Sequence, residues 1–308
     1  MKKQPHYQQY VLALVFIIGI FSFLSGCIET NENDTLSVLV TIVPQQEMVS
    51  FIGGDYVDVT VLVPAGESPH SFEPTPHQMT KVALASAYFK VGSGVEFEQI
   101  HMATILEQNP DLRVFDCSKQ IAVISLDEHY GKKLHHQDKE DNDHNHEGTD
   151  PHIWTSPLNM KEMAETVYEG LVEIDSDHQK HYYANYMNYS THLDSLHQNI
   201  STLLEPCQNK SFMVYHPAWG YFGDTYQLKM IAIEDEGKKP GPAGVAAIVQ
   251  QARNESINVI FVSPQFDTSS AETIAEEING KVVFANPLMT NYEHTLTNLA
   301  EAIVEGYS

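Results

Sequence analysis

The sequence has few basic residues. Only 17 lysines and arginines stand against 41 aspartates and glutamates, so the formal net charge at pH 7 is −24. A surface this acidic repels the phosphates of nucleic acids and of anionic lipid headgroups, which argues against binding either one. It attracts cations weakly and without selectivity. Because acidity also keeps proteins soluble, the charge alone does not define a function.

Cysteine is scarce, and familiar catalytic motifs are missing. The cysteines are Cys27, Cys117 and Cys207, and none has the CxxC spacing of a thiolate zinc site. The sequence contains neither the His-Glu-x-x-His motif of zinc peptidases nor the Gly-x-Ser-x-Gly turn of serine hydrolases. These absences argue against both classes of enzyme. The spacing of Cys117 and Cys207 does not decide whether they form a disulfide.

A single long apolar run, residues 11–24, lies near the N-terminus behind two lysines. It is short for a membrane span and has the length of the apolar core of a signal peptide. It ends in LSGC (24–27), which resembles the lipobox of secreted lipoproteins. We therefore expect a signal peptide over residues 1–27, cleaved before a lipid-modified Cys27. An uncleaved anchor helix is the alternative. In both cases the folded part faces outside the cytoplasm, tethered to the membrane through a flexible segment, residues 28–35.

Apolar strands alternate with helices in both halves of the chain. Residues 36–43 and 57–63 are rich in β-branched residues and predict buried strands, and residues 96–108 predict a helix between later strands. The second half repeats this pattern, for example with a strand at 259–262 after a helix at 242–254. The alternation predicts an α/β fold with mostly parallel sheets flanked by helices. We expect two lobes, residues 36–177 and 206–308.

A long helix is predicted between the lobes, over residues 178–205. It contains neither glycine nor proline before Pro206 is reached. Its apolar residues, among them Tyr182, Tyr189, Leu193 and Ile200, recur at intervals of three and four. This stripe indicates an amphipathic helix that joins the lobes as a rigid strut.

Three histidines have constrained neighbours, each beside a proline. They are His70 in SPHSFEP (68–74), His152 in DPHIW (150–154) and His216 in VYHPAW (214–219). His70 and His216 each follow a predicted strand, one per lobe, and ligands of open α/β sheets bind beyond the carboxyl ends of strands. Neutral imidazoles are nitrogen ligands that suit zinc. We therefore predict that His70, His152 and His216 converge on one divalent metal ion, with zinc favoured, in the cleft between the lobes.

Other histidines lack such settings, although any one histidine alone would be weak support for a metal site. Those of the long helix, including His178 and His197, are interpreted as residues of its polar face. We expect the following to face solvent: His77, His101, His129, His181, His192 and His294.

A polar segment, residues 132–149, is rich in histidine and carboxylates. Its histidines are His135, His136, His144 and His146. It has too few apolar residues to pack, and we predict a disordered insertion. Such a segment captures zinc weakly and exchanges it fast. A solvated acidic linker with histidines present by chance is the alternative.

Together, these motifs resemble those of the substrate-binding lipoproteins of zinc and manganese ABC transporters. The resemblance covers most of the chain after Cys27 and rests on PHSFEP (69–74), DPHIW (150–154), YHPAWGYF (215–222) and SPQF (263–266). It implies two α/β lobes bridged by a rigid long helix, with a metal site between them. The first three metal ligands of that family correspond to His70, His152 and His216.

The remaining ligand position distinguishes the metals within that family. Its manganese and iron members have a glutamate as the third ligand and an aspartate late in the chain, where this sequence has His216 and Asn286. Zinc members often leave the fourth position to water or a nearby carboxylate, and many carry a His-rich acidic loop. The resemblance therefore implies Zn²⁺ rather than Mn²⁺. The family often has glutamate where Ser263 stands, a change without an evident consequence.

The resemblance implies a high-affinity zinc receptor outside the cytoplasm, held by a lipid anchor. As a monomer it would deliver the ion to the membrane permease of an ABC importer. A manganese or iron receptor is the first alternative. A secreted zinc hydrolase is the second, because three histidines with an open fourth position also describe catalytic zinc. A surface adhesin is the third, without a signature beyond the expected surface location.

Overall fold

The computed structural model describes residues 35–307, except for 126–147, 235–237 and 267. The predicted signal peptide with Cys27 lies outside the described residues. So do His129 and the four histidines of the predicted insertion, His135, His136, His144 and His146. The fold below is that of the described residues.

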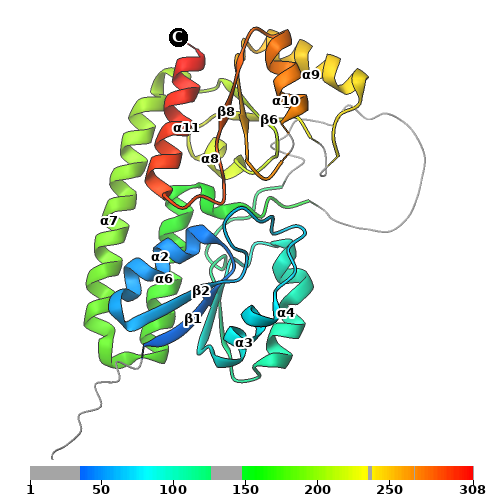
Figure 1. Ribbon diagram of the computed structural model, residues 1–308. Helices are drawn as coiled ribbons and strands as arrows, with labels where there is room; N and C mark the ends of the chain where they lie inside the picture. The colour runs from blue at the N-terminus through cyan, green and yellow to red at the C-terminus, as the bar shows by residue number, and fades with distance from the viewer. Residues whose placement is uncertain (1–34, 126–147, 235–237, 267, 308) are drawn as a thin grey trace, which may run out of the picture. The chain divides into compact units, whose positions relative to one another are not determined.

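A parallel sheet of four strands forms the first half, in the order β2-β1-β3-β4. Helices α2 and α6 lie on the same side of this sheet as the long helix α7, and α3 and α4 lie on the other side (Figure 1). The last three residues of β1 are fully buried, as expected for a central strand covered on both faces. The elements are β1 (Leu36–Val40), α2 (Val43–Gly53), β2 (Val57–Val61), α3 (Pro76–Leu84), β3 (Ala87–Lys90), α4 (Glu96–Gln108), β4 (Arg113–Asp116) and α6 (Pro157–Ile174).

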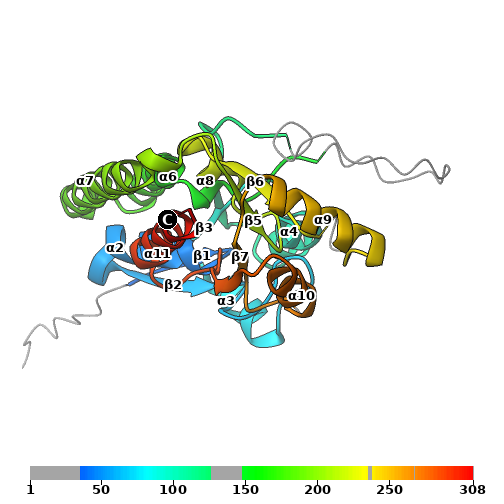
Figure 2. The ribbon, with the colours of Figure 1, turned by 90° about the horizontal axis from the view of Figure 1, so that it is seen from above.

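The second half repeats this topology with a parallel sheet in the order β6-β5-β7-β8. Helices α9 and α10 lie on the side away from α7 (Figure 2). In each sheet the chain returns past its first strand, which creates a switch point beside β1 and beside β5. The elements are β5 (Ser211–Val214), α8 (Gly220–Thr225), β6 (Lys229–Ala232), α9 (Pro242–Asn254), β7 (Val259–Val262), α10 (Ser269–Glu277), β8 (Lys281–Phe284) and α11 (Tyr292–Gly306).

The long helix α7 spans Gln179–Leu204, close to the predicted range. At 1.5 Å per residue its 26 residues extend about 39 Å. The predicted apolar stripe is buried, including Tyr182, Leu193 and Ile200. It contacts α2 and α6 of the first half and α11 of the second, so that α7 runs along both halves (Figure 1). The two-lobe α/β fold joined by a long helix is therefore confirmed.

One apolar core is shared by the two halves. It contains residues of β1 and α6 together with residues of β5, α7 and α11. A smaller core, which includes Met213, Ile260 and Ile274, fills the space between the second sheet and α9 and α10. The last helix, α11, packs on α7. The lobe boundaries expected at residues 177 and 205 stay a prediction.

The starts of α3 and α10 differ in how they are capped. Helix α3 begins with a capping box, in which the backbone N–H of Gln78 donates to Thr75 Oγ1 at 3.3 Å and the backbone N–H of Thr75 donates to Gln78 Oε1 at 2.9 Å. Ser269 and Glu272 have the spacing of a capping box but do not form one. The residue before α10 is Thr268, whose hydroxyl donates to Glu272 at 2.7 Å.

The structure shows the state of two cysteines and the character of the described helices. Cys117 and Cys207 are buried free thiols and do not pair. Among the described helices, none combines the length and the apolar character that a membrane span needs.

Gly170 allows α6 to approach the first sheet closely, which gives a test of this packing. A Cβ atom there would lie 2.6 Å from Phe89 Cε1 and 3.0 Å from Phe115 Cγ. We predict that Gly170→Val lowers the free energy of unfolding by about 1–3 kcal/mol, because the two stacked rings must move. Chemical denaturation measures this loss. Ala184→Val on the exposed face of α7 is the control, and an equal loss in both variants would contradict the packing argument.

Candidate metal centre

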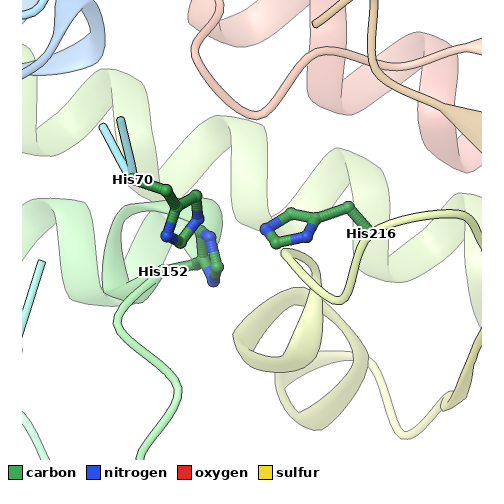
Figure 3. A group of neighbouring side chains, drawn as sticks. All are labelled: His70, His152 and His216. Carbon is green, nitrogen blue, oxygen red and sulfur yellow. The ribbon is translucent and has the colours of Figure 1, made fainter. Parts of the chain in front are cut away.

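His70, His152 and His216 come together in space from three distant parts of the chain. One nitrogen of each ring lies within 4.8 Å of the others. The ring centroids are 5.3 Å apart for His70–His216 and His152–His216, and 6.5 Å for His70–His152. Figure 3 shows the three side chains directed toward a common point. Zinc–nitrogen bonds of about 2.0–2.1 Å in a tetrahedral arrangement hold ligands about 3.4 Å apart, so the three nitrogens lie close to the separation that a shared zinc ion needs.

Each ring pairs its Nδ1 with a carboxylate. The pairs are His70 with Glu96 at 3.0 Å, His152 with Asp150 at 2.7 Å, and His216 with Glu234. A carboxylate at Nδ1 fixes the hydrogen on that nitrogen and the orientation of the ring. The lone pair of Nε2 is then left for the common centre. All three rings are therefore arranged as metal ligands commonly are.

Parallel pairing places Glu234 beside His216. Val214 at the end of β5 pairs with Ala232 at the end of β6, so two residues further on His216 lies beside Glu234. The backbone N–H of Glu234 donates to the carbonyl of Tyr215 at 3.0 Å, which continues the ladder to the site. The Glu234 side chain is only 3% exposed. This carboxylate was not identified from the sequence, although the register of two adjacent strands would have found it.

The segment that carries His152 is bonded to the second half of the fold. Trp154 donates through its indole N–H to the carbonyl of Pro287 at 2.8 Å, and Tyr292 donates its hydroxyl to the carbonyl of Trp154 at 2.8 Å. The hydroxyl of Tyr221 donates to the carbonyl of Asp150 at 3.2 Å. Asp150 and His152 are both buried. His152 is thereby fixed relative to the strand that leads to His216.

His70 is the most exposed of the three, with 38% of its side chain accessible. Its loop is held by α4 through Glu96 and through Phe97, whose ring lies 6.3 Å from that of Phe72. His101, one turn further along α4, lies 3.6 Å from Glu73 of the same loop. The first turn of α4 therefore positions His70.

The solvent-facing prediction for His101 is wrong. His101 is only 8% exposed. Its ring centroid lies 4.8 Å from that of Phe97, under the loop that carries Glu73. The covering element is a loop rather than a sheet, and helical periodicity alone does not reveal it. His197 is also half-buried, with its ring stacked 5.6 Å from Tyr226. The remaining predicted surface histidines that the structure describes are exposed: His77, His181, His192 and His294.

Burial favours the neutral form of two of the three imidazoles. Desolvation, and next the nearby His216, lower the pKa of His70, against the opposing effect of Glu96. Desolvation also lowers the pKa of His216, against the opposing hydrogen bond to Glu234. Neutral imidazole is the form that coordinates a metal. The two groups are thus poised for coordination at neutral pH.

The three rings line a small cavity of about 20 Å³, the space of a single water-sized body. Its wall also contains Ser263, Gln265 and Phe266, and the ring of Phe266 stacks on His216 at 4.7 Å. Among the described residues that line the cavity there is no carboxylate. The side chain of Asn286, considered for the fourth position, is bonded to Gln265 and Leu288 instead.

Comparison with known proteins agrees with this geometry. A family described as the periplasmic component A of zinc-uptake complexes, ZnuA, matches residues 38–306. The high-affinity zinc uptake system protein ZnuA of Bacillus subtilis is 26% identical over 260 residues, 84% of this chain and 80% of that protein. A crystal structure of ZnuA is 32% identical with a TM-score of 0.80, over 89% of this chain and 100% of that one.

A further relative is longer than this chain. The zinc-binding protein AdcA of Streptococcus pyogenes serotype M3 is 25% identical over 287 residues, which is 90% of this chain. The match covers 56% of AdcA, so this chain spans little more than half the length of that relative.

The carboxylate at His216 gives a direct test of the ring-fixing argument. We predict that Glu234→Gln weakens zinc binding about 10–100-fold, because the amide holds the ring less strongly and removes a nearby negative charge. Competition with a fluorescent chelator measures the affinity. Glu107→Gln, on the exposed face of α4, is the matched control and should bind as the unaltered protein does. Equal affinities for all three proteins would show that the carboxylate plays no part.

The lowered pKa values of His70 and His216 predict how binding depends on pH. Protons compete with the metal for imidazole, so affinity falls as pH falls. Since folding moves both pKa values below the ordinary 6.5, the steep loss should begin below that pH rather than above it. Zinc titrations in steps from pH 8 to pH 5 measure the profile. A steep loss already complete at pH 7 would contradict the assignment.

Proposed function

The chain belongs to the family of periplasmic zinc-uptake components, and on this basis we propose that it is an extracytoplasmic, high-affinity zinc receptor that delivers the ion to an ABC importer. The observation that carries the proposal is the meeting of three imidazoles, each with Nδ1 held by a carboxylate. His70, His152 and His216 are the proposed ligands. Zinc is the transported ion, which binds and leaves unchanged.

The donor set supports zinc over manganese. Three imidazole nitrogens and one open position match the four-coordinate geometry of zinc. Manganese prefers six ligands that are mostly oxygen, and no carboxylate among the described residues lines the cavity. The fourth ligand is proposed to be water.

The arrangement of charge supports a receptor over a hydrolase. The family is one of solute-binding receptors. A zinc hydrolase needs a general base beside the metal-bound water. Here Glu96, Asp150 and Glu234 are each engaged by the Nδ1 of a ring. These carboxylates position the rings, and none of them lines the cavity. The adhesin alternative has no supporting observation in this chain.

Location at the cell surface is proposed from the N-terminal sequence. The apolar run and LSGC (24–27) support a cleaved signal and a lipid on Cys27. The lipid would hold the folded part near the membrane permease, with the protein acting as a monomer. The histidines of segment 132–149 are proposed to capture zinc weakly and to be dispensable for the main site.

Single substitutions of the three ligands test the proposal. We predict that His70→Ala, His152→Ala or His216→Ala each weakens zinc binding by a factor of at least about 100, because one of three protein ligands is lost. Deletion of residues 132–149 should leave the tight site intact. Isothermal titration with zinc and with manganese measures both predictions, and the unaltered protein should prefer zinc.

The control for these variants is His77→Ala, which removes an exposed histidine of α3. It should bind zinc as the unaltered protein does. Tight binding by His152→Ala would refute the proposed ligand set. A zinc-dependent hydrolysis of ester or peptide substrates by the purified protein would favour the enzyme alternative.

A further inference from the structure

Two neutral polar side chains besides the histidines line the cavity near the second sheet, Ser263 and Gln265, and Asn286 is hydrogen-bonded to Gln265. Ser263, directly after β7, is buried, and Gln265 lies two residues further along. Asn286 follows β8, the strand next to β7. Parallel pairing of β7 and β8 therefore brings the three side chains to the same edge of the sheet. We call Ser263, Gln265 and Asn286 the amide wall.

The backbone determines which way each amide of this wall is oriented. The N–H of Leu288 donates to Asn286 Oδ1 at 3.0 Å, which identifies that atom as the oxygen. The same oxygen accepts a hydrogen bond of 3.0 Å from Gln265 Nε2. Gln265 Oε1 must then face Ser263, whose hydroxyl donates to it. The chain of assignments starts from a backbone donor, so neither amide is ambiguous.

This orientation leaves Gln265 with one N–H hydrogen that has no partner among the described residues. Both amide oxygens already accept hydrogen bonds from protein donors. Of the two hydrogens on Gln265 Nε2 one is used by Asn286, and the described residues offer no partner for the other. Gln265 lines the same cavity as the three histidines. This N–H belongs to a side chain that lines the cavity, so it is available to a ligand in the open position.

From this arrangement we propose that Gln265 is a specificity-determining residue, which donates a hydrogen bond to the water that completes zinc coordination. The inference rests on the proposed zinc binding. Both amide oxygens of the wall already accept hydrogen bonds from protein donors, so a cation that seeks oxygen ligands must compete with these donors. Zinc, which is satisfied with three nitrogens and one water, does gain a fixed fourth ligand. A water held by one hydrogen bond also exchanges readily.

Two substitutions of Gln265 separate its donor role from its size. Gln265→Glu replaces the amide with a carboxylate that itself offers oxygen to the ion. We expect the preference for zinc over manganese to fall at least about tenfold and zinc to dissociate more slowly. Gln265→Leu keeps the volume and removes the donor. We expect zinc affinity to fall about tenfold, as for other residues that hold a ligand in place.

Cobalt gives a readout that a purely structural role would not change. The visible spectrum of the Co²⁺ form titrates when a bound water loses its proton. A donor to that water stabilises the hydroxide, so the titration midpoint should move to higher pH in Gln265→Leu. The melting temperature of the metal-free variants checks that they fold.

The matched controls are Gln198→Glu and Gln198→Leu on the exposed face of α7, which should change neither selectivity nor spectrum. If the unaltered protein binds zinc while both Gln265 variants keep its metal preference and its spectral midpoint, the role of Gln265 is refuted and the zinc receptor proposal stands. If the unaltered protein does not bind zinc, both fail.

Discussion

The hydrogen bond between a histidine Nδ1 and a carboxylate is the interaction on which the site depends. It occurs three times, with Glu96, Asp150 and Glu234 as the carboxylates. The three carboxylates are supplied in different ways. Glu96 lies in the first turn of α4, Asp150 lies two residues before its histidine, and Glu234 follows the strand that pairs with β5. The three rings are therefore oriented by the fold itself. Preorganised rings lose little conformational freedom when a metal binds, which favours high affinity.

The repeated sheet topology explains why residues so far apart meet. In both sheets the first strand lies in the interior, so the loops after β1 and β5 open at a switch point. His216 follows β5 directly, and the wall residues Ser263 and Asn286 follow β7 and β8. The bonds from Trp154 to Pro287 and from Tyr292 to Trp154 then attach the His152 segment to this sheet. His70 alone is supplied by a loop packed against the first half.

Much of this arrangement was predictable from sequence, and the exceptions have physical reasons. Helices α4 and α9 and strand β7 match their predicted bounds because apolar runs, and the proline that begins α9, are local signals. The three histidines were identifiable from adjacent prolines and bulky apolar neighbours. Glu234 was not, because its role appears only once two strands are in register. His101 was misassigned because a loop covers it, and the direction of the Gln265 amide depends on a backbone N–H of Leu288.

The charge of the site accounts for the kind of ligand it accepts. Asp150 and Glu234 are buried, and burial of a carboxylate is costly unless positive charge or hydrogen bonds compensate. With neutral rings between them, the Nδ1 hydrogen bonds compensate only in part, and the region retains excess negative charge. A dication at the common point of the three rings supplies the missing positive charge while keeping every hydrogen bond. Protonated rings would also supply it, but burial lowers the pKa of His70 and His216. The fold therefore favours a divalent metal over protons as the source of that charge.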